Sequence, residues 1–184
     1  MTTRALIMID VQRGFDSPFF GERNNPGCEA NIRSLVTAWQ DAGQPIVVVR
    51  HDSVQPDSPL RPGTPGNDFK PELDGVNPAL LFGKSVHSAF HGSVDLEKWL
   101  RDRGIEDIVV IGIQTNFCVE TTSRVGGNLG FKVKMAIDAT HTFDATTPDG
   151  ALVTADELAR ATAANLHSGS FAEVTTTKAV LDLL

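Results

Sequence analysis

The segment IVVIGIQTNFCVETTSR, residues 108–124, indicates an α/β fold because it joins a buried strand to the start of a helix. Residues 108–113 are apolar and mostly β-branched, which is typical of a parallel strand covered on both faces of a sheet. The following helix is expected to begin close to Cys118. A thiol at this place is either a small apolar group that fills the core or a nucleophile that faces a pocket.

Further strands and helices alternate along the chain. Strands are expected at residues 5–9, 45–49, 108–113, 131–137 and 170–174. Helices are expected at residues 31–41 and 94–103 and from a capping box at Thr154 and Glu157 through residue 166. This alternation predicts βαβ units, and therefore a three-layer αβα sandwich with a mostly parallel, Rossmann-like central sheet. We expect one domain over residues 1–184.

Residues 52–78 interrupt this alternation. They contain six prolines and include SPLRPGTPGNDFKPEL at residues 58–73. A connection of this length without regular structure is usually a functional loop or a linker, and its prolines favour an ordered loop. Because ligands bind at the carboxyl ends of strands in open α/β sheets, this loop is a candidate wall of an active site.

The charge, hydropathy and cysteine content of the chain limit the kinds of partner and compartment that we expect. The formal net charge of -7 argues against a nucleic-acid or anionic-membrane surface. Apolar runs stay well short of the roughly 20 residues that span a bilayer, and no signal peptide is visible before the first strand. With two cysteines, Cys28 and Cys118, we expect free thiols in a cytoplasmic chain instead of a disulfide framework.

Three of the expected strands end close to candidate site residues. Asp10 ends the first strand, His51 lies at the end of the second, and Gly112 lies near the end of the third. The carboxyl ends of parallel strands share one edge of a sheet, so these positions are expected to converge. Cys118 would lie in the first helical turn, where the helix dipole is expected to lower the pKa of its thiol.

Three segments resemble the signature blocks of the isochorismatase-like cysteine hydrolases, which include nicotinamidase and N-carbamoylsarcosine amidase. They are ALIMIDVQRGF (residues 5–15), FGKSVHSAF (residues 82–90) and GIQTNFCVETTSR (residues 112–124). Residues 138–144 and 154–166 also resemble later segments of the family, so the likeness covers nearly the whole chain. The resemblance implies the isochorismatase-like fold and a catalytic triad of Asp10, Lys84 and Cys118.

The resemblance also implies a role for each residue. Cys118 would attack an amide-like carbonyl carbon and form a thioester, with Asp10 as general base and Lys84 stabilising the negative charges. A cis peptide bond is implied between Ile113 and Gln114. The backbone N–H groups of Gln114 and Cys118 would then form the oxyanion hole. Read singly, Asp10 is more simply a surface cap at a strand end, and Lys84 is an ordinary solvated lysine.

Two departures from the family pattern reduce the number of candidate reactions and substrates. Nicotinamidase-like members carry a metal-binding D-x-H motif and a second histidine, whereas this chain has Asp52 and then Val54. We therefore expect no metal and no other cofactor, and nicotinamide becomes a poor candidate substrate. Isochorismatases that cleave a vinyl ether typically lack the nucleophilic cysteine, so Cys118 favours C–N hydrolysis.

Candidate substrate contacts lie near the strand ends and near Lys84; they are Phe15, His51, His87, Phe90, His141 and Phe143. The alternative for His87 and His141 is hydrogen bonding to loop backbone. Phe15 could form an apolar wall with Phe19 and Phe20, or all three could belong to an interface. Arg61 could meet a substrate carboxylate, Thr115 is expected to fix the turn into the helix, and Cys28 has no assigned role.

The sequence therefore predicts a cysteine-dependent hydrolase that cleaves an amide, lactam or ureido C–N bond of a small molecule. Two alternatives remain, namely vinyl-ether hydrolysis on the same fold and a non-enzymatic, redox-sensing thiol protein. The expected partner is a small-molecule amide, without nucleic acid or membrane. The resemblance also implies a homo-oligomer, as a dimer or larger assembly.

Overall fold

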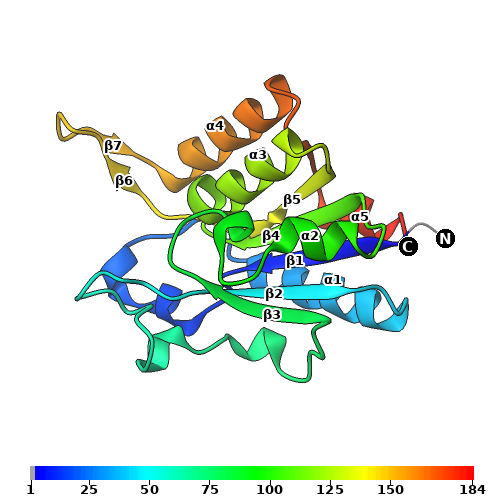
Figure 1. Cartoon of the computed structure of the whole chain (residues 1–184). Helices are drawn as coiled ribbons and strands as arrows, with labels where there is room; N and C mark the ends of the chain where they lie inside the picture. The colour runs from blue at the N-terminus through cyan, green and yellow to red at the C-terminus, as the bar shows by residue number, and fades with distance from the viewer. Residues whose placement is uncertain (1–2) are drawn as a thin grey trace.

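A six-stranded parallel sheet forms the centre of the computed structural model, which describes residues 3–184 (Figure 1). The strands are β1 (Arg4–Ile9), β2 (Ile46–His51), β3 (Leu80–Lys84), β4 (Asp107–Ile113), β5 (Lys132–His141) and β8 (Glu173–Thr175). Their order in the sheet is β3-β2-β1-β4-β5-β8, and each neighbouring pair is parallel. All carboxyl ends therefore share one edge, as predicted.

Helices cover both faces of the sheet and complete the predicted three layers (Figure 1). They are α1 (Cys28–Asp41), α2 (Leu96–Arg101), α3 (Glu120–Asn128), α4 (Ala155–Ser168) and α5 (Thr177–Leu181). The alternation of side chains along β1 separates two cores. Ile7 and Ile9 pack with residues of α2 and α4, whereas Leu6 and Met8 pack with residues of α1 and α5. Among the residues that the structure describes, no helix is long and apolar enough to cross a membrane.

Most of the expected elements are present, with shifted bounds. Predicted strands appear as β1, β2, β4, β5 and β8, and the first predicted helix begins earlier, at Cys28. The predicted helix at residues 94–103 is shorter, because Asp95 caps it by accepting a 2.9 Å hydrogen bond from the Lys98 N–H. The sequence did not predict β3, α5 or the short hairpin of β6 (Ala145–Thr146) and β7 (Leu152–Val153).

The proline-rich segment 52–78 is an ordered loop with two short 3-10 turns, Pro65–Asn67 and Pro71–Leu73. Asn67 is buried at its centre. The Asn67 side-chain amide donates hydrogen bonds to the backbone oxygens of His51 and Leu60, at 3.0 and 2.9 Å. These bonds fasten the loop to the end of β2 and hold it beside the carboxyl edge of the sheet.

Gly112 lets β1 and β4 approach closely at that edge. Its φ is +120°, and a Cβ added there would lie 2.0 Å from the backbone oxygen of Ile9. Only glycine fits this position, because any side chain would collide with neighbouring backbone. The close approach brings the residues that follow β1 and β4 together.

The capping box at Thr154 is present at the start of α4 and allows a stability test. The Thr154 hydroxyl accepts a hydrogen bond from the Glu157 N–H at 3.3 Å, and the Glu157 carboxylate accepts one from the Thr154 N–H at 2.9 Å. Thr154→Ala is expected to lower the free energy of unfolding by about 1 kcal/mol. Urea denaturation would measure this loss. Thr154→Ser keeps the hydroxyl and should retain stability, so equal losses in both variants would contradict the capping role.

Candidate active site

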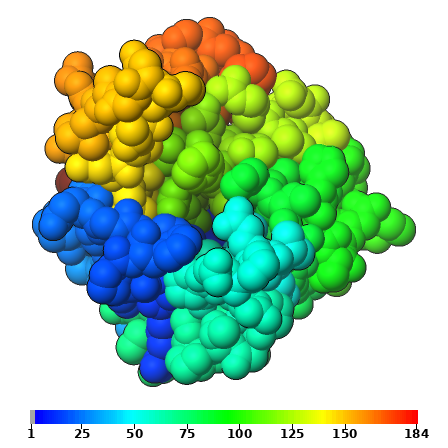
Figure 2. Space-filling model, turned by 90° about the vertical axis from the view of Figure 1, so that its left-hand side faces the viewer, coloured from blue at the N-terminus to red at the C-terminus, as the bar shows by residue number. Residues whose placement is uncertain are grey.

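A pocket opens at the carboxyl edge of the sheet, where β1, β2 and β4 end. Figure 2 shows this face, with the blue segment that follows β1, the cyan loop that follows β2 and the green segments around a hollow. The cavity has a volume of about 300 Å³. It is lined by Asp10, Phe15, Phe19, Phe20, His51, Ser53, Gln55, Ser58, Leu60, His87, Gln114, Phe117 and Cys118.

Asp10 and Cys118 lie at the floor of this pocket, with the Lys84 ammonium buried beneath Asp10. The Lys84 Nζ donates a 2.7 Å hydrogen bond to the Asp10 Oδ2, and both side chains are fully buried. Ligand atoms of Asp10, His51 and Cys118 all lie within 4.8 Å of one another. The structure therefore places a thiol, a carboxylate and an ammonium in one small volume.

Local backbone structure positions the carboxylate and the thiol. Asp10 continues the β1 ladder by donating its N–H to the Val49 oxygen at 2.9 Å, and its φ of 52° turns the chain there. Cys118 lies in a π-helical turn, Thr115–Val119, that precedes α3. The buried hydroxyls of Thr115 and Thr140 are 2.8 Å apart. This contact ties the turn to β5, whereas no side-chain hydrogen bond caps the turn.

Burial controls the ionisation of the thiol. It raises the pKa of Cys118, and the neighbouring Asp10 carboxylate raises that pKa further. The sequence predicted a lowered thiol pKa; the pKa is instead raised, because the thiol is only 5% exposed and is desolvated. Burial also raises the pKa of Asp10, although Lys84 opposes this shift. The carboxylate is therefore a stronger base than usual, beside a thiol that favours its neutral form.

His51 is tied to the same cluster. Its Nδ1 lies 3.1 Å from the Lys84 Nζ and accepts a hydrogen bond from that ammonium. Burial and then Lys84 lower the pKa of His51 to about 4, so its imidazole is neutral at neutral pH. Gln12 holds the backbone of His51, accepting from its N–H at 2.8 Å and donating to its oxygen at 3.1 Å.

His87 approaches the thiol from the pocket mouth. Its Nδ1 is 3.5 Å from the Cys118 Sγ. Its exposed ring stacks on Phe117, with centroids 5.5 Å apart, and on His51, with centroids 6.4 Å apart. His51 and His87 are thus both pocket residues, as the sequence predicted.

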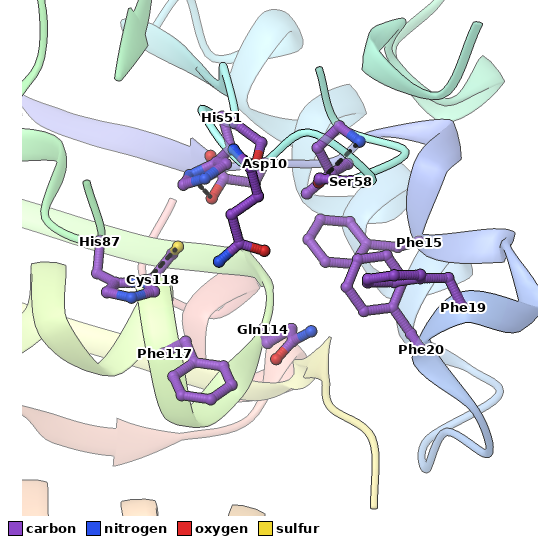
Figure 3. A pocket seen from close by; sticks show the side chains of 13 residues that line it. Asp10, Phe15, Phe19, Phe20, His51, Ser58, His87, Gln114, Phe117 and Cys118 are labelled. Atoms are coloured by element: carbon purple, nitrogen blue, oxygen red, sulfur yellow. Dashed lines mark hydrogen bonds and ion pairs between the residues drawn. The ribbon is translucent and has the colours of Figure 1, made fainter. Parts of the chain in front are cut away.

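Three phenylalanines form an apolar wall opposite the thiol. Figure 3 shows Phe15, Phe19 and Phe20 grouped on one side of the pocket, with Cys118 and His87 on the other. The Phe15 and Phe20 ring centroids are 4.8 Å apart. Of the two predictions for this cluster, the structure matches the wall.

Three of the predicted substrate contacts do not line the pocket. Phe90 stacks on Phe131 and packs against the core beneath α3. Phe143 is buried behind the wall, with its ring 5.2 Å from that of Phe20. His141 is fully buried, which lowers its pKa to about 3, and its ring nitrogens have no hydrogen-bond partner among the described residues. All three residues lie close to strand ends or to Lys84 in the sequence, but their side chains point into the core and away from the pocket. The sequence does not show this direction.

Arg61, which could have met a substrate carboxylate, is likewise outside the pocket lining. The Arg61 guanidinium donates to the Pro56 oxygen at 2.8 Å. Several pocket residues were missed in the sequence, namely Ser53, Gln55, Ser58, Leu60 and Phe117. Four of them belong to the proline-rich loop, whose position after β2 was the available signal.

Within the part of the chain that the structure describes, a metal ion could be held by Asp10, His51 and Cys118. The Lys84 ammonium makes metal binding there unfavourable, because it contacts both Asp10 and the His51 Nδ1 and would repel a cation. Asp52, from the incomplete D-x-H motif, is paired with Arg50 at 2.7 Å, and Val54 is exposed. The donor set therefore fits proton transfer better than metal binding.

The fold and the pocket define the class of this protein, an α/β protein with a buried thiol, carboxylate and ammonium at the carboxyl edge of a parallel sheet. A model of the isochorismatase domain matches residues 4–179, so the chain belongs to the isochorismatase family. The resemblance seen in the three sequence blocks is thereby confirmed, and the chain is a hydrolase of that family.

Comparisons with individual proteins agree with this assignment. The chain is 33% identical to YrdC, an isochorismatase family protein of Bacillus subtilis, over 97% of this chain and 95% of YrdC. It is 32% identical to the nicotinamidase/pyrazinamidase of Mycobacterium tuberculosis, over 81% and 92% of the two chains. A solved structure of an isochorismatase-family hydrolase from Chromobacterium violaceum has a TM-score of 0.91 and 39% identity, covering 98% of this chain and 92% of that one.

Proposed function

We propose that the protein hydrolyses a C–N bond of a small-molecule amide through a thioester on Cys118. The observation that best supports this proposal is the buried ion pair of Asp10 and Lys84, which lies beside the Cys118 thiol in the pocket lining. The similarity to a nicotinamidase/pyrazinamidase supports amide chemistry. The hydrogen bond from Lys84 holds the Asp10 carboxylate in one position, as is needed for a group that accepts and returns a proton in each catalytic cycle.

Acylation begins with proton transfer from the thiol. Because burial raises the pKa of Cys118 and also that of Asp10, the carboxylate takes the proton as the Sγ attacks the carbonyl carbon. The Lys84 ammonium stays hydrogen-bonded to Asp10 and stabilises the charges nearby. A tetrahedral intermediate then holds a negative oxygen, for which the backbone N–H groups of Gln114 and Cys118 are the proposed donors. The Ile113–Gln114 peptide bond, to which the Gln114 N–H belongs, is cis.

Collapse of the intermediate breaks the C–N bond. Asp10 returns its proton to the departing nitrogen, which leaves as a neutral amine or ammonia. Water then attacks the thioester carbonyl while Asp10 accepts a proton from it. The C–S bond breaks, the acid leaves, and Asp10 returns this proton to the Cys118 sulfur, which restores the thiol. The residues end in their starting protonation states, so one water is consumed for each C–N bond cleaved.

Ammonia release from a panel of primary amides tests this function directly. Turnover by the wild type that disappears in Asp10→Asn, whose side chain cannot act as the base, is the expected result. Pyruvate release from isochorismate, without amide turnover, would instead support vinyl-ether hydrolysis. A redox-sensing role predicts oxidation of Cys118 without hydrolysis, which its burial and raised pKa disfavour.

His51 is proposed to position Lys84, which gives a matched pair of variants. His51→Ala removes the acceptor at 3.1 Å from the Lys84 Nζ and is expected to lower kcat by up to about 100-fold. In His51→Asn the side-chain oxygen can replace the Nδ1 acceptor, so most of the activity should return. Steady-state kinetics would measure both variants. Equal losses in the two would contradict the positioning role.

A further inference from the structure

The pocket lining offers neutral polar groups and an apolar wall to a substrate. Hydroxyl and amide side chains come from Ser53, Ser58, Gln55 and Gln114, and the wall comes from three phenylalanines. Among the described lining residues, Asp10 is the only aspartate or glutamate, and none is arginine or lysine. His51 adds no positive charge near neutral pH, because its pKa is lowered to about 4.

Lys84 and two arginines of neighbouring segments already have partners. Lys84 donates to Asp10 and His51 from below the floor. Arg50 is paired with Asp52 at 2.7 Å, and Arg61 is bonded to loop backbone. A substrate carboxylate in the cavity would therefore lose its hydration near the Asp10 carboxylate, without an arginine or lysine in the described lining to replace the water. Such burial of an unpaired charge is strongly unfavourable.

We infer that the pocket selects uncharged amides that carry a flat apolar group, and that it discriminates against amides that carry a carboxylate. This inference rests on the proposed C–N hydrolysis at Cys118 and names its substrate class. The flat group would pack on Phe15 and Phe20, whose rings form the wall opposite the thiol. A cavity of about 300 Å³ has the size of a small-molecule site. Isochorismate, with two carboxylates, fits this pocket poorly.

Two alkylating reagents of the same size test the charge selectivity without any turnover. Iodoacetamide is neutral and iodoacetate is anionic; with each, the Cys118 sulfur forms an S–C bond, iodide leaves and the thiol proton passes to the buffer. Peptide mass spectrometry would give the ratio of the two rates at Cys118. The thiolate fraction cancels within this ratio. Dividing by the same ratio for free N-acetylcysteinamide, a thiol that carries no carboxylate, removes the difference in intrinsic reactivity between the two reagents. We expect Cys118 to favour iodoacetamide at least about tenfold more than the free thiol does.

Two lysine variants show whether the pocket causes this preference. Gln55→Lys adds a cation to the pocket lining, whereas Val54→Lys adds the same charge at a neighbouring residue that is 78% exposed and outside the lining. Gln55→Lys is expected to reduce the preference at least about threefold, and Val54→Lys is expected to leave it unchanged. A wild-type ratio equal to that of the free thiol would overturn the inference, and so would equal effects of the two lysines.

Hydrolysis rates of two related amides test the charge selectivity and the proposed amidase function separately. Benzamide and 3-carbamoylbenzoate share a ring and a primary amide, and differ by one carboxylate. We expect kcat/KM from ammonia release to be at least about 100-fold higher for benzamide. Equal or faster hydrolysis of the carboxylate would overturn the selectivity while supporting the amidase. If neither compound nor any other amide of the panel were hydrolysed, the proposed function would fail, and the alkylation ratio would still decide the charge selectivity.

Discussion

Replacing Cys118 with alanine is expected to lower kcat on any amide substrate by at least about 1,000-fold, because the variant has no nucleophile to form the thioester. Binding should persist, since the alanine leaves the other twelve lining residues of the thirteen in place. Ammonia release at saturating substrate measures the loss. Mass spectrometry of the wild type, quenched during turnover, should show an acyl adduct on the peptide that carries Cys118.

Cys28 provides the matched control. It is also fully buried, but it lies in the α1 core and outside the pocket. Cys28→Ala should therefore lower stability through a lost core contact while kcat stays close to that of the wild type. Full turnover in Cys118→Ala, with the adduct absent in the wild type, would rule out the thioester mechanism.

Replacing Lys84 with methionine is expected to lower the free energy of unfolding by about 3–5 kcal/mol, because the fully buried Asp10 then loses its counter-charge. Methionine keeps most of the volume of the side chain, so the loss reports the charge and not a cavity. Activity should fall with stability, since an unpaired Asp10 favours its protonated form and can no longer accept the thiol proton. Urea denaturation and ammonia release measure the two losses.

The double variant Asp10→Asn/Lys84→Met is the control for this result. It removes both charges together, so its free energy of unfolding should lie much closer to the wild type than that of Lys84→Met. It should nevertheless remain inactive, because it lacks the base. Additive losses from the two single substitutions would show that the two charges do not stabilise one another.

Much of the fold was predictable because parallel strands buried on both faces are apolar throughout. β1, β2 and β4 carry this signal, and their order places Asp10 and the segment that holds Cys118 at one edge. β3 was missed because it is an edge strand of five residues, LLFGK, that contains a glycine and ends in a lysine. The position of Lys84 therefore came from the family resemblance and not from the strand pattern.

The finer features of the site depend on packing that the sequence does not encode locally. The helix N-terminus suggested a low thiol pKa, but burial of Cys118 reverses the direction of the shift. Phe90, His141 and Phe143 lie near the right elements, yet their side chains pack behind the pocket. His51 was expected to contact substrate, whereas its clearest partner is the Lys84 ammonium. These differences arise from burial and from side-chain direction within the folded chain.

The proline-rich loop allows the substrate specificity of the enzyme to change during evolution. Asp10 and Lys84 stand at the ends of strands, while Ser53, Gln55 and Ser58 belong to the loop. Surface loops tolerate substitution and insertion far better than the strands of a sheet do. Mutations in residues 52–60 can therefore alter what is accepted while the reactive groups keep their geometry. A lineage carrying this architecture could acquire new substrates by small steps, each leaving a folded, reactive enzyme.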